Sequence, residues 1–297
     1  AIGTGAWSAG TASGQQHASG GGAGTREAYL AVSGYIGGQP GAGNETFNGS
    51  SWTTVNSLVN PRYSCTGSFG TQTACITAGG PDGTSNWNTE IWDGTCFTQT
   101  SDFNRTTGYN EMGGTGTTTA GLIFKGNPGN VVLTESWDGT SWSSVNNGSN
   151  GSHGCFAIGT STAALTCGGN APPSPPPTYI GTTETWDGTS WTEVNPMLLA
   201  RGKGASSGTS TAGLIGGGNN ALTPAKDETE IWDGTSWTEV ADMGTARYQN
   251  FGTPGGTSLA ALTTGGAATG SPAPTVNYLV EEWDDPTGNA VKTFTSS

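Results

Sequence analysis

A segment of twelve residues occurs twice in this chain with a single difference. Residues 183–194 read TETWDGTSWTEV and residues 229–240 read TEIWDGTSWTEV. Looser copies surround four further glutamates, so the segment recurs every 45 to 51 residues along the 297-residue chain. The six repeated glutamates are Glu45, Glu90, Glu135, Glu184, Glu230 and Glu281. A period of this length indicates one supersecondary unit built six times.

A second repeated element, a short apolar run that closes on two glycines, precedes each glutamate. Clear copies are TACITAGG at 73–80, TAALTCGG at 162–169 and TAGLIGG at 211–217, and we expect further copies to end at Gly37-Gly38, Lys125-Gly126 and Gly265-Gly266. Together the two elements predict four strands per unit, with an Asp-Gly turn between the last two. Radial repetition lets such units bury both faces against their neighbours.

The repeat therefore predicts an all-β chain forming a single domain over residues 1–297, a six-bladed β-propeller with four-stranded antiparallel blades. The chain begins partway through a unit, where residues around Trp7 resemble a fourth strand, and it ends after Glu281 with residues such as Phe294 that continue a unit. We expect the two termini to close the ring in one shared blade. Which terminus supplies the outermost strand stays open.

The repeat resembles Kelch repeats over nearly the whole chain. The matching features are the double glycine closing the second strand, the acidic and aromatic pair of Glu-x-Trp in the third, and the tryptophan of the fourth. The WD dipeptide lacks the upstream Gly-His of WD40 repeats. Asp187 and Gly188 are adjacent, whereas the Asp-box of sialidases separates these residues.

The net charge, the hydropathy and the cysteine content limit the partners and cofactors that we expect. Nine Lys and Arg against 22 Asp and Glu give a net charge of −13, which repels phosphate backbones, so we expect no nucleic-acid partner. No apolar run approaches the length of a membrane span, so we expect no membrane insertion. The five cysteines form no CxxC motif, and we expect neither metal nor cofactor. Cys155 and Cys167 flank a predicted hairpin, and we favour free thiols over a disulfide.

Residues that recur in every unit are interpreted as framework. We expect the six glutamates to accept backbone N–H groups and the repeated tryptophans to form the core between blades. Arg62, Arg201 and Arg247 occupy equivalent positions, where they hold an anion or, as we favour, satisfy carbonyls and carboxylates. His17 and His153 have no partner motif that would mark a base or a ligand.

Segments that escape the repeat are the candidates for binding, because loops on a rigid scaffold usually carry function. They join the second strand to the third, and the Kelch resemblance implies that they emerge on one face together with the loops between units. These segments are 38–44, 81–88, 170–180, 219–226 and 267–278. The candidate partner-binding residues are Trp87, Pro172, Pro175, Pro177, Tyr179, Asn220 and Tyr278.

The Gly- and Thr-rich copies around Trp-Asp-Gly-Thr-Ser-Trp also resemble Kelch-like propellers of tailed bacteriophages, especially marine ones. The resemblance implies a non-enzymatic virion protein of tail, fibre or capsid surface, located on the particle. Its expected partners are other virion proteins or a host surface receptor or glycan, and multimerisation within an assembly stays open. The alternative is a carbohydrate-active propeller enzyme of the sialidase or oxidase kind.

Overall fold

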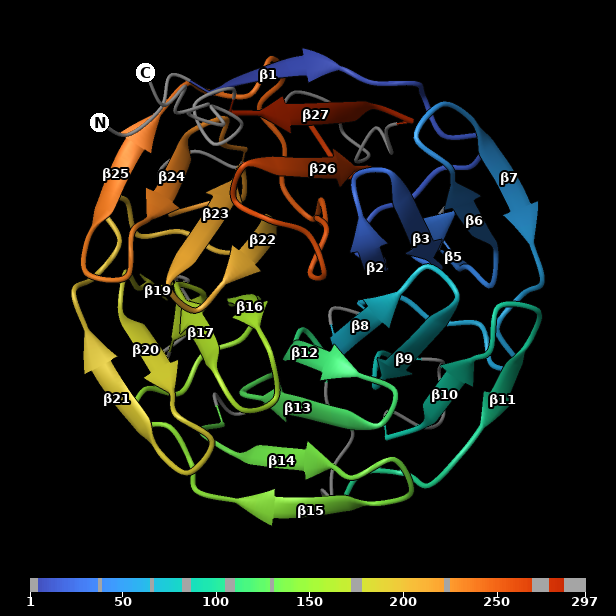
Figure 1. Cartoon of the computed structure of the whole chain (residues 1–297), viewed down its shortest axis with the longest axis horizontal. Coiled ribbons are helices and arrows are strands. Elements are labelled where there is room, and N and C mark those ends of the chain that lie inside the picture. The colour runs from blue at the N-terminus through green and yellow to red at the C-terminus, as the bar shows by residue number, and fades with distance from the viewer. Residues whose placement is uncertain are drawn as a thin grey trace, which may run out of the picture.

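The chain forms a ring of six β-sheets around a central axis (Figure 1). The computed structural model describes residues 5–36, 39–64, 67–81, 87–104, 110–128, 131–171, 178–221, 225–268 and 278–285. Within these ranges every regular element is a β-strand, and no helix is long and apolar enough to cross a membrane. The six-bladed all-β propeller predicted from the repeat is thus confirmed.

Five of the blades are antiparallel sheets of four strands, ordered from the innermost strand a to the outermost strand d. Blade 1 comprises β2 (Gly21–Thr25), β3 (Ala28–Val32), β6 (Asn44–Phe47) and β7 (Trp52–Val55), and blade 2 comprises β8 (Gly67–Thr71), β9 (Ala74–Ala78), β10 (Thr89–Trp92) and β11 (Phe97–Gln99). Blade 3 comprises β12 (Gly113–Thr117), β13 (Ala120–Phe124), β14 (Thr134–Trp137) and β15 (Trp142–Val145). Blade 4 comprises β16 (Phe156–Gly159), β17 (Ala164–Cys167), β20 (Thr183–Trp186) and β21 (Trp191–Val194), and blade 5 comprises β22 (Ala205–Thr209), β23 (Ala212–Gly216), β24 (Thr229–Trp232) and β25 (Trp237–Val240).

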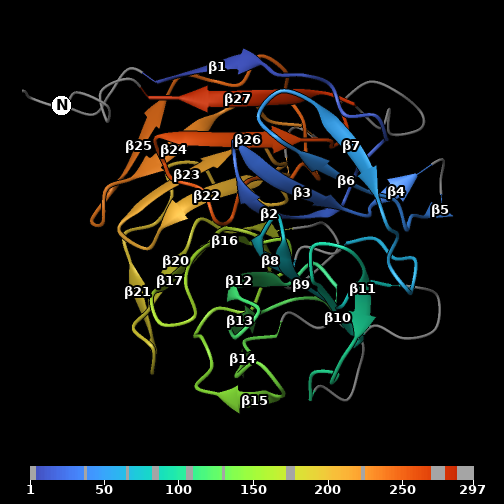
Figure 2. The ribbon, with the colours of Figure 1, turned by 45° about the vertical axis from the view of Figure 1, so that its right-hand side comes forward.

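Two short hairpins lie between strands b and c. They are β4 (Tyr35–Ile36) with β5 (Gln39–Pro40) in blade 1, and β18 (Asn170–Ala171) with β19 (Thr178–Tyr179) in blade 4. Figure 2 shows β4 and β5 extending from blade 1 to one side of the ring. Antiparallel strands place every b-to-c segment on the face that also carries the d-to-a segments, as expected from the sequence.

Blade 6 is built from both halves of the chain. Its sheet has the order β26 (Ala260–Thr264), β27 (Val280–Asp284) and β1 (Ala6–Ala9), so the first strand of the chain lies outermost (Figure 1). Trp7 lies opposite Trp283 in this register. Strand a is reduced to a bridge between Phe251 and Thr264. The N-terminal strand therefore takes the strand-d position of the sixth blade.

Apolar side chains are buried between blades rather than within them. Six core clusters occur among the described residues, and each joins two neighbouring blades. The cluster between blades 6 and 1 joins Phe251 and Leu262 to Tyr29 and Phe47. The six interfaces therefore form an uninterrupted ring of apolar packing.

The repeated tryptophans serve this core, as predicted. In strand c their indole N–H groups donate to a carbonyl of the a-to-b turn of the same blade over 2.9 to 3.0 Å; the residues are Trp92, Trp137, Trp186, Trp232 and Trp283. In strand d, Trp142, Trp191 and Trp237 donate to a threonine hydroxyl of the preceding blade. Trp7 makes the same bond to Thr229 of blade 5 over 2.9 Å. Each ring is buried or half-buried with its polar group satisfied.

The prediction that strand b of blade 1 ends at Gly37-Gly38 is wrong. That strand ends at Val32, and Ser33 and Gly34 take the place of the double glycine with φ of 55° and 121°. Lys125 occupies the first of these positions in blade 3, with φ of 59°. Glycine pairs mark this turn because it needs left-handed backbone, but in blades 1 and 3 a serine and a lysine also adopt it.

On the face opposite to the b-to-c segments, blade 6 reaches into the centre of the ring. The segment between β25 and β26 runs inward to the middle of the ring (Figure 1). There the Gly255 N–H donates to the carbonyl of Gly24 in blade 1 over 3.2 Å, and the Ser207 hydroxyl of blade 5 donates to the carbonyls of Thr253 and Thr257 over 3.0 Å. The same segment thus contacts both neighbouring blades, 5 and 1, near the axis.

Candidate functional site

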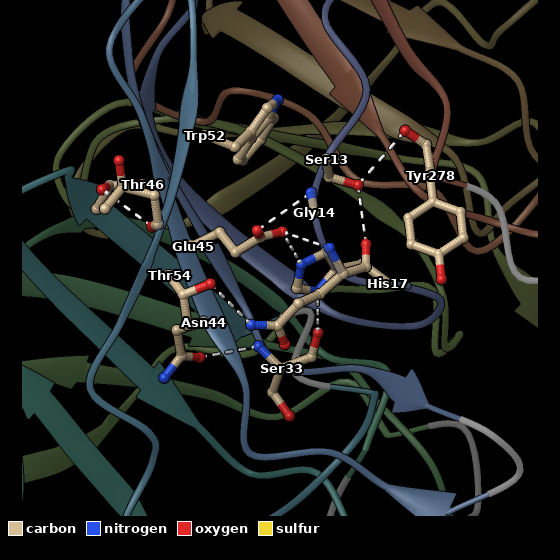
Figure 3. Close-up of polar contacts among 12 residues, drawn as sticks. Ser13, Gly14, His17, Ser33, Asn44, Glu45, Thr46, Trp52, Thr54 and Tyr278 are labelled. Carbon is tan, nitrogen blue, oxygen red and sulfur yellow. Dashed lines mark hydrogen bonds and ion pairs between the residues drawn. The ribbon is translucent and has the colours of Figure 1, made fainter.

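The repeated glutamates form a buried framework node in each blade. Every one is at most 6% exposed and accepts an N–H from the segment that enters strand a of its own blade. In blade 1, Glu45 accepts the N–H groups of Gly14 and Gln15 and lies 3.2 Å from His17 Nε2 (Figure 3). The structural role predicted for these glutamates is confirmed.

The equivalent arginines also belong to the framework, as we favoured. Arg62 pairs with Glu90, Arg201 with Glu230, and Arg247 with Glu281, the last over 2.9 Å. Each guanidinium also donates to the carbonyl of the first glycine after strand b. These groups are 0 to 1% exposed, so they are unavailable to an anion in the channel.

Blades 1 and 4 build the node differently. His17 takes the arginine position in blade 1, and its Nδ1 lies 2.7 Å from the carbonyl oxygen of Ser33. In blade 4 that position is Ser152, whose hydroxyl donates to the Gly168 carbonyl, while Lys125 of blade 3 places its ammonium 3.0 Å from Glu184. In blade 4 the cation of the node therefore comes from the neighbouring blade and not from the segment that enters strand a.

These contacts shift the pKa values of the carboxyl groups that they surround. Burial alone raises the pKa of Glu45, but the hydrogen bonds from His17 and from the Gln15 and Gly14 N–H groups outweigh it and lower the pKa below its ordinary value. For Glu184, burial is outweighed by the charge of Lys125 and by the hydrogen bonds from Ser149, so its pKa is also lowered. Both carboxyl groups are therefore ionised at neutral pH.

Two residues beyond each node, the chain forms a closed ring around the axis. One residue per blade adopts left-handed backbone, with φ between 51° and 63°. Its N–H donates to the carbonyl of the corresponding residue in the neighbouring blade, with N···O distances of 2.5 to 3.5 Å. The six residues are Ser19, Ser64, Glu111, Gly154, Lys203 and Gln249. The backbone is the same in every blade and the side chain is not.

A wall of six backbone pairings stands above this ring, one in each blade. In each, a residue next to the ring bonds to the start of the b-to-c segment. The pairs are Ala18 with Tyr35, Tyr63 with Pro81, Asn110 with Asn127, His153 with Asn170, Gly202 with Asn219, and Tyr248 with Ala267. Blades 6, 1 and 2 thus present tyrosines, while blades 3, 4 and 5 present amides and a histidine.

Ring and wall enclose an axial pocket of about 440 Å³. Its lining includes Tyr35 and Tyr63 on one side and Asn110, Asn127 and His153 on the other. The two tyrosine rings meet edge to face, with centroids 4.7 Å apart. The volume lies within the range of small-ligand sites.

Charged groups of the pocket come from three consecutive blades. Lys203 Nζ donates to Glu111 Oε1 over 2.7 Å, and His153 Nε2 lies 3.6 Å from Glu111 Oε2. Burial lowers the pKa of His153, followed by opposing influences of Glu111 and Lys203, so the imidazole is neutral at pH 7. The cluster then carries one negative and one positive charge.

Of the candidate partner-binding residues, Tyr179 interacts with Glu111 of the pocket lining. Burial and then the negative charge of Glu111 raise the pKa of its phenol, which bonds to the Asn219 side chain. Trp87 and Tyr278 are 37% and 45% exposed and lie outside the pocket lining, and Asn220 is half-buried beside Asn219. Pro172, Pro175 and Pro177 lie outside the described residues.

Glu111, His153, Lys203 and Tyr63 were not selected from the sequence. A signal was present: the position two residues after Arg62, Arg201 and Arg247 holds a different residue in each unit, Ser64, Lys203 and Gln249. The arginine position is the same in these units, and the position two residues later is not. This change from a repeated to a variable residue marks the boundary between framework and surface.

The described cysteines are thiols. Cys155 and Cys167 are both free, as favoured from the sequence, and burial raises the pKa of each. Among the described residues, no group of three or more His, Cys, Asp or Glu side chains is placed to hold a metal ion. No protein-family model matches this chain, and no curated protein matches it. The class of the protein is therefore defined by its fold, a six-bladed β-propeller with an axial pocket.

Proposed function

We propose that this protein is a non-enzymatic recognition module of a virion surface, a Kelch-like propeller that binds a host glycan or a partner protein. The virion setting rests on the resemblance of its repeat to the propellers of tailed bacteriophages. Binding takes place on the face that carries the b-to-c segments.

One observation carries the proposal. The axial pocket is lined by side chains that are not the same in all six blades, on a backbone ring that is the same in every blade. A ligand without sixfold symmetry needs such an unequal lining, and a rigid scaffold lowers the entropy cost of holding it. The framework nodes contribute nothing to this contact, because their charged groups are buried and paired.

A carbohydrate-active enzyme is the second candidate, favoured by the titratable groups in the pocket. Glycoside hydrolysis ordinarily needs two carboxyl groups flanking the scissile bond. Glu111 is the one carboxylate among the described residues that line the pocket. Release of sugar from a panel of chromogenic glycosides, abolished by Glu111→Gln, would favour the enzyme over the binding module.

Two tryptophan substitutions in blade 3 test the proposed face. Asn127 lines the pocket, whereas Thr140 is exposed in the c-to-d turn on the opposite face. Labelled protein applied to a glycan array and to bacterial cells should bind, Asn127→Trp should abolish binding, and Thr140→Trp should leave it intact. Binding that survives Asn127→Trp in a folded protein would move the contact away from the axis. Antibody labelling of purified particles tests the virion setting.

A further inference from the structure

The two halves of the axial pocket differ in chemistry. Blades 1 and 2 contribute the edge-to-face pair Tyr35 and Tyr63, and Tyr248 of blade 6 occupies the corresponding wall position, close enough to Tyr179 to raise the pKa of its phenol. Blade 3 contributes the side-chain amides of Asn110 and Asn127 and the Glu111 carboxylate, which pairs with Lys203 of blade 5. A ligand that fits both halves has an apolar face toward the tyrosines, and hydrogen-bonding groups toward blade 3 and toward the polar ring, which includes Ser19, Ser64 and Gln249.

The charges of the pocket favour a neutral ligand. The ammonium of Lys203 is held by Glu111, so a ligand carboxylate would compete with an existing ion pair. His153 adds no positive charge at neutral pH because burial lowers its pKa. The four deeper cations at the nodes, Arg62, Lys125, Arg201 and Arg247, are at most 2% exposed. The net charge of −13 also repels anions at long range.

The hydrogen-bonding groups favour hydroxyls over other neutral groups. Asn110, Asn127 and Gln249 each offer an N–H donor and a carbonyl acceptor, and Ser19 and Ser64 offer hydroxyls. The Asn110 side-chain oxygen is buried and has no hydrogen-bond partner. A sugar hydroxyl both donates and accepts, so one ring can satisfy several of these groups together.

On these grounds, and resting on the proposed function, we infer that the axial pocket takes the uncharged, non-reducing end of a glycan. One face of the terminal sugar packs on Tyr35 and Tyr63. Its hydroxyls donate to the Glu111 carboxylate and to Asn110, while Lys203 holds Glu111 in place. Glu111 determines the preference for a neutral sugar, because it repels a carboxylate placed at the same point.

Binding to paired oligosaccharides tests this ligand class. The probes are oligosaccharides ending in neutral hexoses and otherwise identical ones ending in a uronic or sialic acid, measured by calorimetry and on an array. We expect binding of neutral ends only. Glu111→Gln should weaken it about 10- to 100-fold, because a charged acceptor of ligand hydroxyls is lost. Tyr63→Ala should weaken it similarly, while Tyr63→Phe, which keeps the ring, should bind nearly as well.

A matched control removes the same charge elsewhere. Glu193 is exposed on β21, and Glu193→Gln should leave binding unchanged. Thermal melting of each variant separates loss of binding from loss of fold. Binding of acidic ends alone, or of a protein partner that the Asn127→Trp variant no longer recognises, would overturn this ligand class and leave the proposed function standing. Attachment that ignores every pocket variant would overturn both.

Discussion

Arg201 and Lys203 are two residues apart and carry the same charge, yet they belong to different parts of the molecule. Arg201 is fully buried, pairs with Glu230, and has counterparts in other blades. Lys203 is 20% exposed, pairs with Glu111 across the channel, and has no counterpart. Within three residues the chain passes from a position that every blade needs to one that a ligand can use.

The comparison separates two roles that a charged side chain can have in a repeat protein. At the nodes the charge compensates another buried charge, so the residue is constrained by the fold. On the axial ring the backbone maintains the structure, through hydrogen bonds between neighbouring blades, and the side chain is left to vary. The ring can change its ligand without changing its blades.

The largest effect should come from breaking a node. Arg201→Met leaves Glu230 buried without its cation, and we expect the free energy of unfolding to fall by about 3–5 kcal/mol. Lys203→Met removes a partly exposed partner of Glu111 and should cost less than about 1 kcal/mol. Urea denaturation measures both. Equal losses would show that the arginine and the lysine contribute alike to the stability of the fold.

Blade 4 allows the node to be broken and rebuilt. Lys125→Gly suits the left-handed backbone at that position but removes the cation beside Glu184, and should cost roughly 3 kcal/mol. Adding Ser152→Arg returns a guanidinium to the position that Arg201 holds in blade 5. We expect the double variant to regain at least about 1 kcal/mol over Lys125→Gly alone. Additive losses would refute the exchange of cations between segments.

Acid should destabilise the fold through Glu45 and Glu184, the node carboxyl groups whose pKa values are lowered. The pKa of Glu45 and of Glu184 is lower in the folded protein, so the unfolded chain binds more protons below the ordinary glutamate pKa of about 4.3. Stability contributed by these groups is complete above that pH and is lost as the pH falls through the folded values. Glu184→Gln should flatten this dependence in denaturation measured between neutral and acidic pH.

The smallest effect, and one of opposite sign, is expected on the axial ring. Gln249→Gly relieves a left-handed side chain (φ 59°) at a cost in backbone entropy, so stability should stay level or rise by up to about 1 kcal/mol. Gly154→Ala is the reverse experiment. Its Cβ would lie 2.7 Å from Lys203 Cγ at φ of 63°, and it should lower the melting temperature.

The fold could be predicted because each blade places the same physical demands on the same residues. Trp232 must be buried and Glu230 must accept N–H groups in every unit, so both repeat in the sequence. The axial pocket could not be predicted in this way, because its lining residues are the ones that do not repeat. The role of His17 at its node was not predicted because a histidine replaces an arginine there, and that of Lys125 because its partner lies in another blade.

The single strand β1 also gives the ring a mechanical weak point. Ala6, the first residue of β1, lies opposite Asp284, the last residue of β27. The N-terminal and C-terminal sides of the chain therefore meet this strand pair at the same end. Tension applied between the two ends would load the hydrogen bonds of this pair one after another, as when a zipper opens, instead of shearing them together. A propeller held at both chain ends would therefore open at blade 6 under tension. A propeller held at one chain end would not load this strand pair, and its ring would stay intact.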